Sequence, residues 1–173
     1  VGTALLMMPF AARDGVGASF GDAAFTATSA ACVTGLVVQD TATYWSFWGQ
    51  AIILVLIQIG GMGVVTAAAA LSAIAGRRIG LAQRSVMQEA ISAPQIGGIV
   101  RITKFSVKMM ASIEALGAVL LIVPFCREFG ALRGAWYAVF HSVSSFCNAG
   151  FDLMGVKEHF SSLVSYAGHP VVN

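Results

Sequence analysis

Charged residues are scarce in this chain of 173 residues, because ten Lys or Arg and eight Asp or Glu make up only 10% of it. An ordinary soluble domain carries about 25% charged residues, and it needs polar side chains to cover its surface. Since 57% of the residues are hydrophobic, a soluble globular domain is excluded. Intrinsic disorder is excluded as well, because disordered segments combine few apolar residues with a high net charge. The composition therefore predicts a membrane protein.

Residue patterns that would indicate catalysis or a bound metal are also missing. The three Cys are widely spaced, which provides neither a disulfide framework nor a CxxC pattern. Cys32 and Cys147 lack the further Cys or His ligands of a closed metal site, so we interpret them as small apolar residues. No His is suitably spaced for a Ser or Cys triad, and Gly60–Gly63 lacks the Lys of a phosphate-binding loop. We predict no enzyme activity, no cofactor held by this chain and no nucleic-acid partner.

The longest stretch without a charged residue contains 36 residues, between Asp40 and Arg77. A membrane-spanning helix needs about 20 apolar residues, so this stretch contains one complete span, which we place at Phe47–Ala75. Aromatic residues gather at its start, as expected at a membrane interface. We predict a second span at Ile102–Cys126 and the tail of a third helix at Val1–Phe10. The chain also starts and stops within apolar runs, and we expect it to be a piece of a longer, multi-pass protein of the cell membrane.

The distribution of basic residues predicts the orientation of these spans. Six of the ten Lys and Arg lie between Gly76 and Lys108 with Glu89 as the only acid, and four lie in the other segments. Because positive residues remain on the cytoplasmic side, we place the stretch 76–104 in the cytoplasm. It could lie along anionic lipid, bind a regulatory subunit, or only determine topology.

Two apolar stretches, 20–38 and 126–155, are too short to cross the membrane and return as helices. A re-entrant loop, with a short helix inward and a non-helical return, satisfies this geometry. Such backbone occurs at membrane depth where it is buried in protein or lines a water-filled path.

The two stretches belong to an internal repeat. A shift of 115 residues aligns Leu5–Leu36 with Leu120–Phe151 without a gap, and ten of the 32 positions are identical. The identities in the first copy are Leu5, Leu6, Pro9, Phe10, Gly15, Ala23, Phe25, Ser29, Cys32 and Gly35. The spacing F-x3-S-x2-C-x2-G in both copies makes a chance match improbable, and repeats determine architecture. We predict an all-α integral membrane fold made of repeated helix–pore loop–helix units of the potassium-channel type.

The repeat divides the chain into three parts. Residues 1–75 hold the end of one outer helix, a pore loop and an inner helix, and residues 76–104 form the cytoplasmic linker. Residues 105–173 hold the second outer helix, its loop and the start of an inner helix.

The loops are the predicted ion-binding elements. We expect a short helix at Ala23–Ala31, capped by Asp22, with its negative C-terminal end at mid-membrane. An extended return at Cys32–Leu36 would follow, where Gly35 permits unusual backbone dihedrals and unpaired carbonyls could replace the hydration shell of a cation. No acidic residue lies in either loop core, which favours a monovalent ion. The predicted filter residues are Cys32, Val33, Thr34 and Gly35 in the first copy and Cys147, Asn148, Ala149 and Gly150 in the second.

Four segments resemble the Ktr/Trk/HKT superfamily of potassium transporters, and most closely the bacterial Ktr membrane subunit. Phe25–Leu36, followed by Asp40-Thr41, resembles the first pore loop of this family, and Ile57–Gly63 resembles the helix that follows it. Gly80–Ala90 with Gly97-Gly98 resembles the cytoplasmic linker of the family, and His141–Asp152 resembles its second pore loop.

The resemblance implies potassium uptake through four helix–loop–helix repeats around one pore, with Gly35 and Gly150 as two filter glycines. It also implies a homodimer and a cytoplasmic nucleotide-binding ring as regulator. Glycine at the first filter position resembles the potassium-selective members, whereas plant relatives with serine there pass sodium more readily. Two of the four repeats are absent from this chain. Whether sodium serves as a coupling or activating ion is a question that the resemblance leaves open.

The sequence leaves open the role of Glu114 and two other functions of the whole chain. Glu114, an acid inside the second span, is either a residue of the permeation path or a buried partner for a polar group on a neighbouring helix, and we favour the partner role. The whole chain could instead be part of a secondary cation transporter with broken helices or a non-conducting membrane scaffold. The transporter would usually have inverted repeats, whereas these two copies share one orientation.

Overall fold

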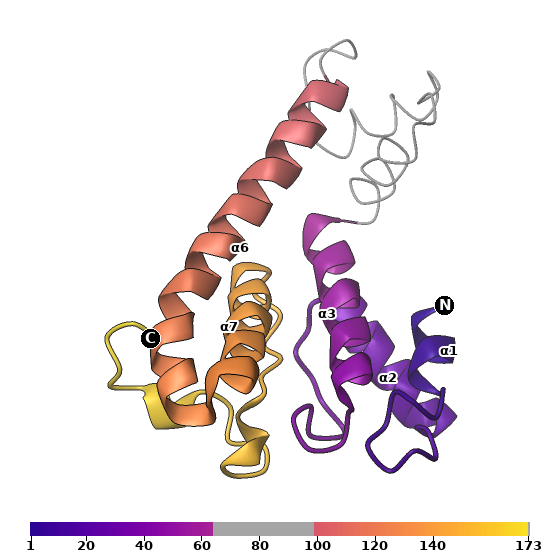
Figure 1. Cartoon of the computed structure of the whole chain (residues 1–173). Coiled ribbons are helices and arrows are strands. Elements are labelled where there is room, and N and C mark those ends of the chain that lie inside the picture. Colours follow the sequence, from indigo (N-terminus) through magenta and orange to yellow (C-terminus); the bar gives the residue numbers. More distant parts are fainter. Residues whose placement is uncertain (64–98, 173) are drawn as a thin grey trace. The chain divides into compact units, whose positions relative to one another are not determined.

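A computed structural model describes residues 1–63 and 99–172 of the chain (Figure 1). Within these ranges the chain forms helices and one isolated β-bridge, between Ala12 and Trp45, and it contains no strand. The prediction of an all-α fold is thereby confirmed for the described residues. The elements are α1 Gly2–Leu6, α2 Phe20–Ala31, α3 Phe47–Met62, α6 Ile99–Phe129, α7 Ala131–Phe146 and the 3-10 helices η2 Met154–Val156 and η3 Val164–Tyr166.

The chain divides into two compact units. The first consists of Val1–Gly61 with Glu114–Asn173, and the second of Met62–Ile113. Most of the predicted cytoplasmic linker, 76–104, lies outside the described residues, as do its motifs at 80–90 and 97–98. The candidate loops both belong to the first unit.

Helix α2 begins three residues earlier than the predicted Ala23, because a different residue caps it. The Ser19 side-chain oxygen accepts a hydrogen bond from the backbone N–H of Asp22 at 3.1 Å. Ser is a favourable N-cap, and Asp22 lies in the first turn, where its negative charge favours the helix N-terminus. The prediction that Asp22 is the cap is therefore wrong.

Helix α3 follows the prediction at its start but not at its end. Its buried residues, Gly49, Gln50, Ile53 and Ile57, recur at the three- and four-residue spacing of one helix face. The helix ends at Met62, and Gly63 follows with φ of +77°, a left-handed conformation typical of a helix end. The rest of the predicted span, 64–75, lies outside the described residues.

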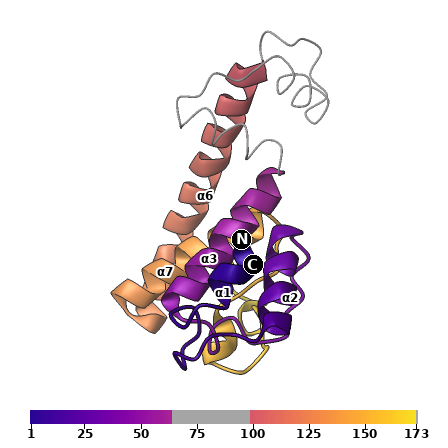
Figure 2. The ribbon, with the colours of Figure 1, turned by 90° about the vertical axis from the view of Figure 1, so that its right-hand side faces the viewer.

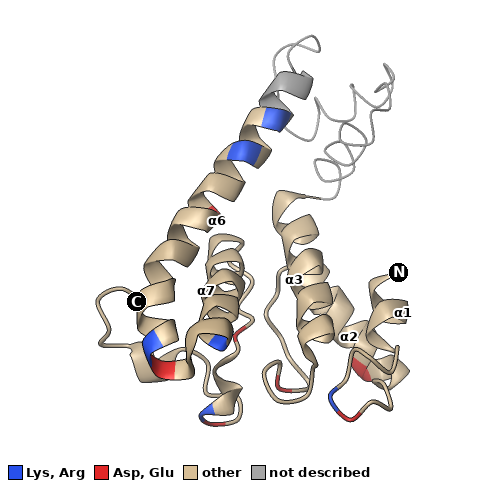
Figure 3. Ribbon diagram, viewed as in Figure 1, with Lys and Arg blue, Asp and Glu red and all other residues tan. Residues whose placement is uncertain are grey.

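Helix α6 contains the clearest candidate for a membrane span. By length and composition, Lys104–Phe129 is the one helix among the described residues that could cross a membrane, and only 11% of its most apolar window is buried within the protein. It extends the predicted span, Ile102–Cys126, by three residues at its C-terminal end. Figure 3 shows that charges on this helix gather towards its two ends. Large apolar side chains such as Leu116 and Val119 are exposed along it, as expected for a surface that faces lipid.

At the N-terminus, the structure differs from the predicted helical tail at 1–10. Helix α1 spans only Gly2–Leu6 and lies against α2, as Figure 2 also shows. Leu6 is fully buried there. Of the predicted tail, residues 7–10 are therefore turn rather than helix.

The hydrophobic core of the first unit is built from both copies of the repeat. Its largest fully buried side chains are Trp45, Phe125, Phe140, Phe151, Leu6, Ile53, Ile57, Leu153 and Met154. Residues from the first copy and the second copy therefore share one core. Removal of a large core side chain should destabilise the whole unit.

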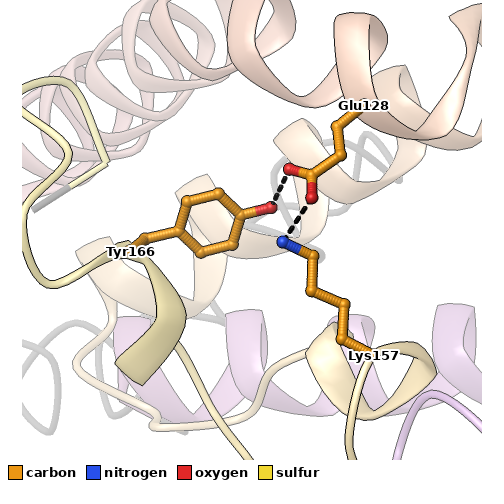
Figure 4. Close-up of polar contacts among 3 residues, drawn as sticks. All are labelled: Glu128, Lys157 and Tyr166. Atoms are coloured by element: carbon orange, nitrogen blue, oxygen red, sulfur yellow. Dashed lines mark hydrogen bonds and ion pairs between the residues drawn. The ribbon is translucent and has the colours of Figure 1, made fainter.

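A polar cluster at the end of α6 fixes the segment that follows α7 (Figure 4). The Glu128 carboxylate accepts a hydrogen bond from the Tyr166 hydroxyl and forms an ion pair with Lys157. The Lys157 ammonium also lies 4.2 Å from the centre of the Tyr166 ring. Since these side chains are partly exposed, the ion pair itself contributes little to stability.

We predict that Phe125→Ala destabilises the protein much more than Phe105→Ala. Phe125 is fully buried and contacts the rings of Phe129, His141 and Tyr166, whereas Phe105 is 64% exposed. A buried Phe→Ala change costs about 3–5 kcal/mol of unfolding free energy. Denaturant unfolding of the purified protein in detergent measures both changes, and equal losses for the two variants would contradict the assigned core.

Candidate ion-binding site

The first predicted filter segment directly follows helix α2. Cys32 ends the helix with φ of −90°, and its backbone N–H donates to the Thr28 carbonyl at 2.8 Å. Val33 and Gly35 have φ of +57° and +70°, whereas Thr34 between them does not have a positive φ. Left-handed residues therefore alternate with ordinary ones along this return segment, a detail that the sequence analysis did not specify.

The second predicted filter segment, after helix α7, has the same backbone. Asn148 and Gly150 have φ of +55° and +72°, and Cys147 ends the helix with φ of −76°. Three backbone hydrogen bonds recur with the shift of 115 residues. In the first copy, the backbone N–H groups of Cys32, Val33 and Thr34 donate to the carbonyls of Thr28, Ala30 and Ser29, respectively. In the second copy, those of Cys147, Asn148 and Ala149 donate to the carbonyls of Val143, Ser145 and Ser144.

The two segments lie against each other at their glycines. A Cβ atom built on Gly35 would lie 2.5 Å from the Ala149 carbonyl oxygen and 3.1 Å from the Gly150 Cα. A Cβ atom built on Gly150 would lie 3.3 Å from the Gly35 Cα. The left-handed conformation favours glycine at both positions, and at Gly35 the close contact with the Ala149 carbonyl also leaves no room for a Cβ atom.

The carbonyl groups of these segments are not used to hold the fold together. Among the described residues, no hydrogen bond reaches the carbonyl oxygens of 32–35 or of 147–150. Four of these residues are exposed, namely Cys32, Thr34, Asn148 and Gly150, so their carbonyls need no partner within the protein. Carbonyl oxygens without a partner in the described part of the protein, at matching positions in two adjacent segments, are therefore available to coordinate a cation.

Helix α3 packs against both segments through small residues. A Cβ atom on Gly60 would overlap the Ala31 carbonyl, and one on Gly61 would overlap the Cys147 side chain. The absence of side chains at these glycines therefore permits the close approach of α3 to both segments. Cys147 is partly buried in this contact, and no group of three or more potential metal ligands occurs among the described residues.

Side chains of the two short helices support the segments from behind. The hydroxyl groups of Ser29 and Thr34 lie 2.9 Å apart in the first copy. In the second copy the Ser144 hydroxyl donates to the Phe151 carbonyl at 2.6 Å. Serine at this position of both copies thus stabilises the return of the chain, although its partner differs.

Open cavities border the two glycines. One of about 190 Å³ is lined by Gly35, Gly150 and the side chains of Asp152 and Ser162, among others. A second, of about 250 Å³, is lined by Gly150, Asn148 and His141. Asp152 lines both, and one of its carboxylate oxygens accepts the Met154 backbone N–H at 2.8 Å. The space beside the glycines therefore has oxygen atoms at its walls.

Asp40 joins the loops that follow the two segments. One of its oxygens accepts the backbone N–H groups of Ala42 and Thr43 at 2.9 Å each, and the other accepts the Phe160 N–H at 3.0 Å. A Cβ atom on Gly155 would overlap this carboxylate. Burial alone would raise the pKa of Asp40, but these hydrogen bonds outweigh it and hold the pKa below its ordinary value.

Glu114 has the polar partner that the sequence analysis favoured. Its two carboxylate oxygens accept hydrogen bonds from the Gln58 amide at 2.9 and 3.1 Å. Its backbone carbonyl accepts the Ser142 hydroxyl at 2.6 Å. Glu114 thus connects α6 to both α3 and α7. The sequence analysis expected a polar partner for Glu114 but could not identify which residue it is.

The helical fold of the described residues and the apolar, largely unburied helix Lys104–Phe129 are those expected of a helical membrane protein. The family described as Cation transport protein, TrkH, matches residues 5–173, so this chain belongs to the TrkH family. The resemblance deduced from the loop motifs is thereby confirmed at the level of the family.

Curated relatives of the chain have related names. It is 45% identical over 154 residues to the Potassium/sodium uptake protein NtpJ of Enterococcus hirae, a match that covers 89% of this chain and 34% of the relative. It is 40% identical over 173 residues to the Ktr system potassium uptake protein B of Bacillus subtilis, covering 100% of this chain and 37% of the relative. The corresponding protein of Vibrio alginolyticus is 37% identical over 98% of this chain and 36% of the relative. The chain spans about a third of the length of these relatives.

We predict that Asp40 makes stability depend on acid pH. Because its pKa is lowered in the folded state, its contribution is complete above the ordinary Asp pKa of about 3.9 and is lost as the pH falls through the native pKa. Asp40→Asn should therefore reduce the unfolding free energy at pH 7, by about 1–3 kcal/mol, and flatten its decrease below pH ~4.

Thermal unfolding in detergent between pH 3 and 7 measures this effect. Asp14→Asn is the matched control, because the Asp14 carboxylate is exposed and, within the described residues, accepts one hydrogen bond, from the Val16 N–H. An Asp40→Asn variant with the stability and pH profile of the control would contradict the role of this carboxylate.

Proposed function

We propose that the chain forms part of the potassium-translocating subunit of an uptake system, and that the segments 32–35 and 147–150 contribute to a carbonyl-lined selectivity filter. The observation that carries the proposal is the direct contact of Gly35 with Gly150, in two segments with the same alternating backbone. Membership of a cation transport family and the printed names of the relatives support it.

The backbone supplies the chemistry. In a strand, successive carbonyls point in alternating directions, and reversing the sign of φ at every second residue turns them towards one side. Positive φ at 33 and 35, and again at 148 and 150, follows this scheme. Rows of unpaired carbonyls can replace the water around a desolvated cation, as in potassium filters.

The charge of the site favours a monovalent ion. Neither 32–36 nor 147–151 contains an acidic residue, and Asp152 is the first acid after the second segment. Neutral carbonyls at short range compensate the dehydration of a weakly hydrated ion, whereas divalent ions in proteins take carboxylate ligands. The helices α2 and α7 end at these segments, and the negative ends of their dipoles favour a cation there.

The helix–pore loop–helix repeat is the architecture that we infer for this function. The three hydrogen bonds that recur with the shift of 115 residues support two copies of one unit. Both copies run in the same direction relative to their matching helix ends, which argues against a secondary transporter with inverted broken helices. A non-conducting scaffold would not need unpaired carbonyls in adjacent segments.

The proposal extends to location and partners. We infer a multi-pass protein of the cell membrane in which two further repeats complete the pore. A homodimer of this subunit and a cytoplasmic nucleotide-binding ring are the proposed partners. Relatives that carry the name of a Ktr system support a regulatory subunit, whereas the homodimer and the nucleotide rest on the resemblance of the loop motifs. Sodium, which the name of the Enterococcus relative includes, is the ion to test beside potassium.

We predict that Gly35→Ser or Gly150→Ser, in the complete protein, lowers discrimination between potassium and sodium. The new side chain strains a left-handed residue at either position. At Gly35 it also overlaps the Ala149 carbonyl, and at Gly150 it comes within 3.3 Å of the Gly35 Cα, so the carbonyl positions shift. The potassium-to-sodium flux ratio in proteoliposomes should fall about tenfold, equivalent to ~1.4 kcal/mol.

Gly15→Ser provides a matched control, because Gly15 has the same φ of +70° but a Cβ atom there would meet nothing within 4 Å. It imposes the same backbone strain without the collision and should retain selectivity. If both filter variants retain the flux ratio of the unchanged protein, the proposed filter is wrong.

A further inference from the structure

His141 stands out as a buried polar side chain beside the second segment. It lies on α7, is only 2% exposed and lines the cavity of about 250 Å³ that borders Gly150. Its ring packs against the rings of Phe125 and Phe140, with centres 5.3 and 6.0 Å away. A large aromatic pocket therefore holds the imidazole in one orientation.

Both ring nitrogens of His141 have partners. Nδ1 lies 2.7 Å from the Tyr137 carbonyl oxygen, and Nε2 accepts the backbone N–H of Leu153 at 3.2 Å. Since a carbonyl can only accept a hydrogen bond and a backbone N–H can only donate one, Nδ1 carries the proton and the ring is neutral. The imidazole thus connects the helix before the second segment to the chain after it.

The chain after Gly150 is held at two points by α7. The Ser144 hydroxyl donates to Phe151, the residue next to the glycine, and His141 accepts from Leu153. In the first copy, the equivalents of His141 and Leu153 are Thr26 and Val38. No side-chain hydrogen bond joins these two among the described residues, so the imidazole contact is specific to the second copy.

We propose that His141 is a positioning residue for ion selectivity, which fixes the carbonyls of the second segment through its hydrogen bond to Leu153. The proposal rests on the proposed function of that segment. Sites that must hold a ligand geometry closely depend on a rigid supporting shell of hydrogen bonds. Loss of the acceptor would leave the Leu153 N–H unpaired in a buried position and allow residues 150–153 to relax.

The test uses four variants of the complete protein, with potassium and sodium fluxes measured in proteoliposomes at equal protein content. His141→Phe keeps the ring packing but has no acceptor, and His141→Asn is polar but too short to reach Leu153. Both should lower the potassium-to-sodium flux ratio about fivefold to tenfold, as expected for one buried hydrogen bond. His141→Gln places an amide oxygen near the position of Nε2 and should restore most of the ratio. His159→Gln, at an exposed histidine, should leave it unchanged.

The outcomes separate the two proposals. If Gly150→Ser lowers the ratio but His141→Phe and His141→Asn do not, His141 only fills space and the inference is overturned while the filter stands. If all His141 variants lower it equally, including His141→Gln, the hydrogen bond is not the cause and the inference also fails. If Gly35→Ser and Gly150→Ser both leave the ratio unchanged, the proposed filter is wrong and the inference about His141 fails with it. Should His141→Phe not assemble, His141→Asn and His141→Gln still provide the comparison.

Discussion

The backbone contact between Gly35 and Gly150 is the constraint on which the candidate site depends. Two segments 115 residues apart approach until a single added carbon atom would collide with the opposite chain. Such an approach is possible because both residues lack a side chain and tolerate positive φ. Small residues continue outward from it, since Gly60 and Gly61 bring α3 against the same two segments. The hydroxyls of Ser29 and Ser144, the imidazole of His141 and the carboxylate of Asp40 then use hydrogen bonds to hold what the glycines allow.

Several polar side chains of this largely apolar chain stabilise the fold through hydrogen bonds within the protein. Glu114 bonds to Gln58, and Asp40 bonds to three backbone N–H groups from two loops. Each of these groups is buried or partly buried and has its partner within the protein, as buried polar groups require. The carbonyls of the two segments differ, because no hydrogen bond within the described residues reaches them and several of their residues are exposed.

Much of this could be predicted from the sequence, and the reasons for the failures are physical. The long charge-free runs, the identical spacing in two copies and the loop motifs predicted the helical class, α6 and the family. The start of α2 was misplaced because Ser19 caps it rather than Asp22. The alternation of left-handed and ordinary residues in the two return segments was not predicted, because hydrophobic periodicity does not report the sign of φ. The distant partners of Glu114, Asp40 and His141 are Gln58, Phe160 and Leu153, which lie 56, 120 and 12 residues away in the chain. A single sequence carries no signal for such pairs.

The central claim is that carbonyl oxygens of the two segments bind a weakly hydrated monovalent cation. Anomalous diffraction from crystals of the complete protein grown with rubidium or thallium ions in place of potassium tests it most directly. The account predicts an anomalous peak between residues 33–35 and 148–150, within coordination distance of their carbonyl oxygens and displaced by excess potassium. Ordered density for both segments with no ion between them, or an ion bound only at acidic side chains such as Asp152, would contradict it.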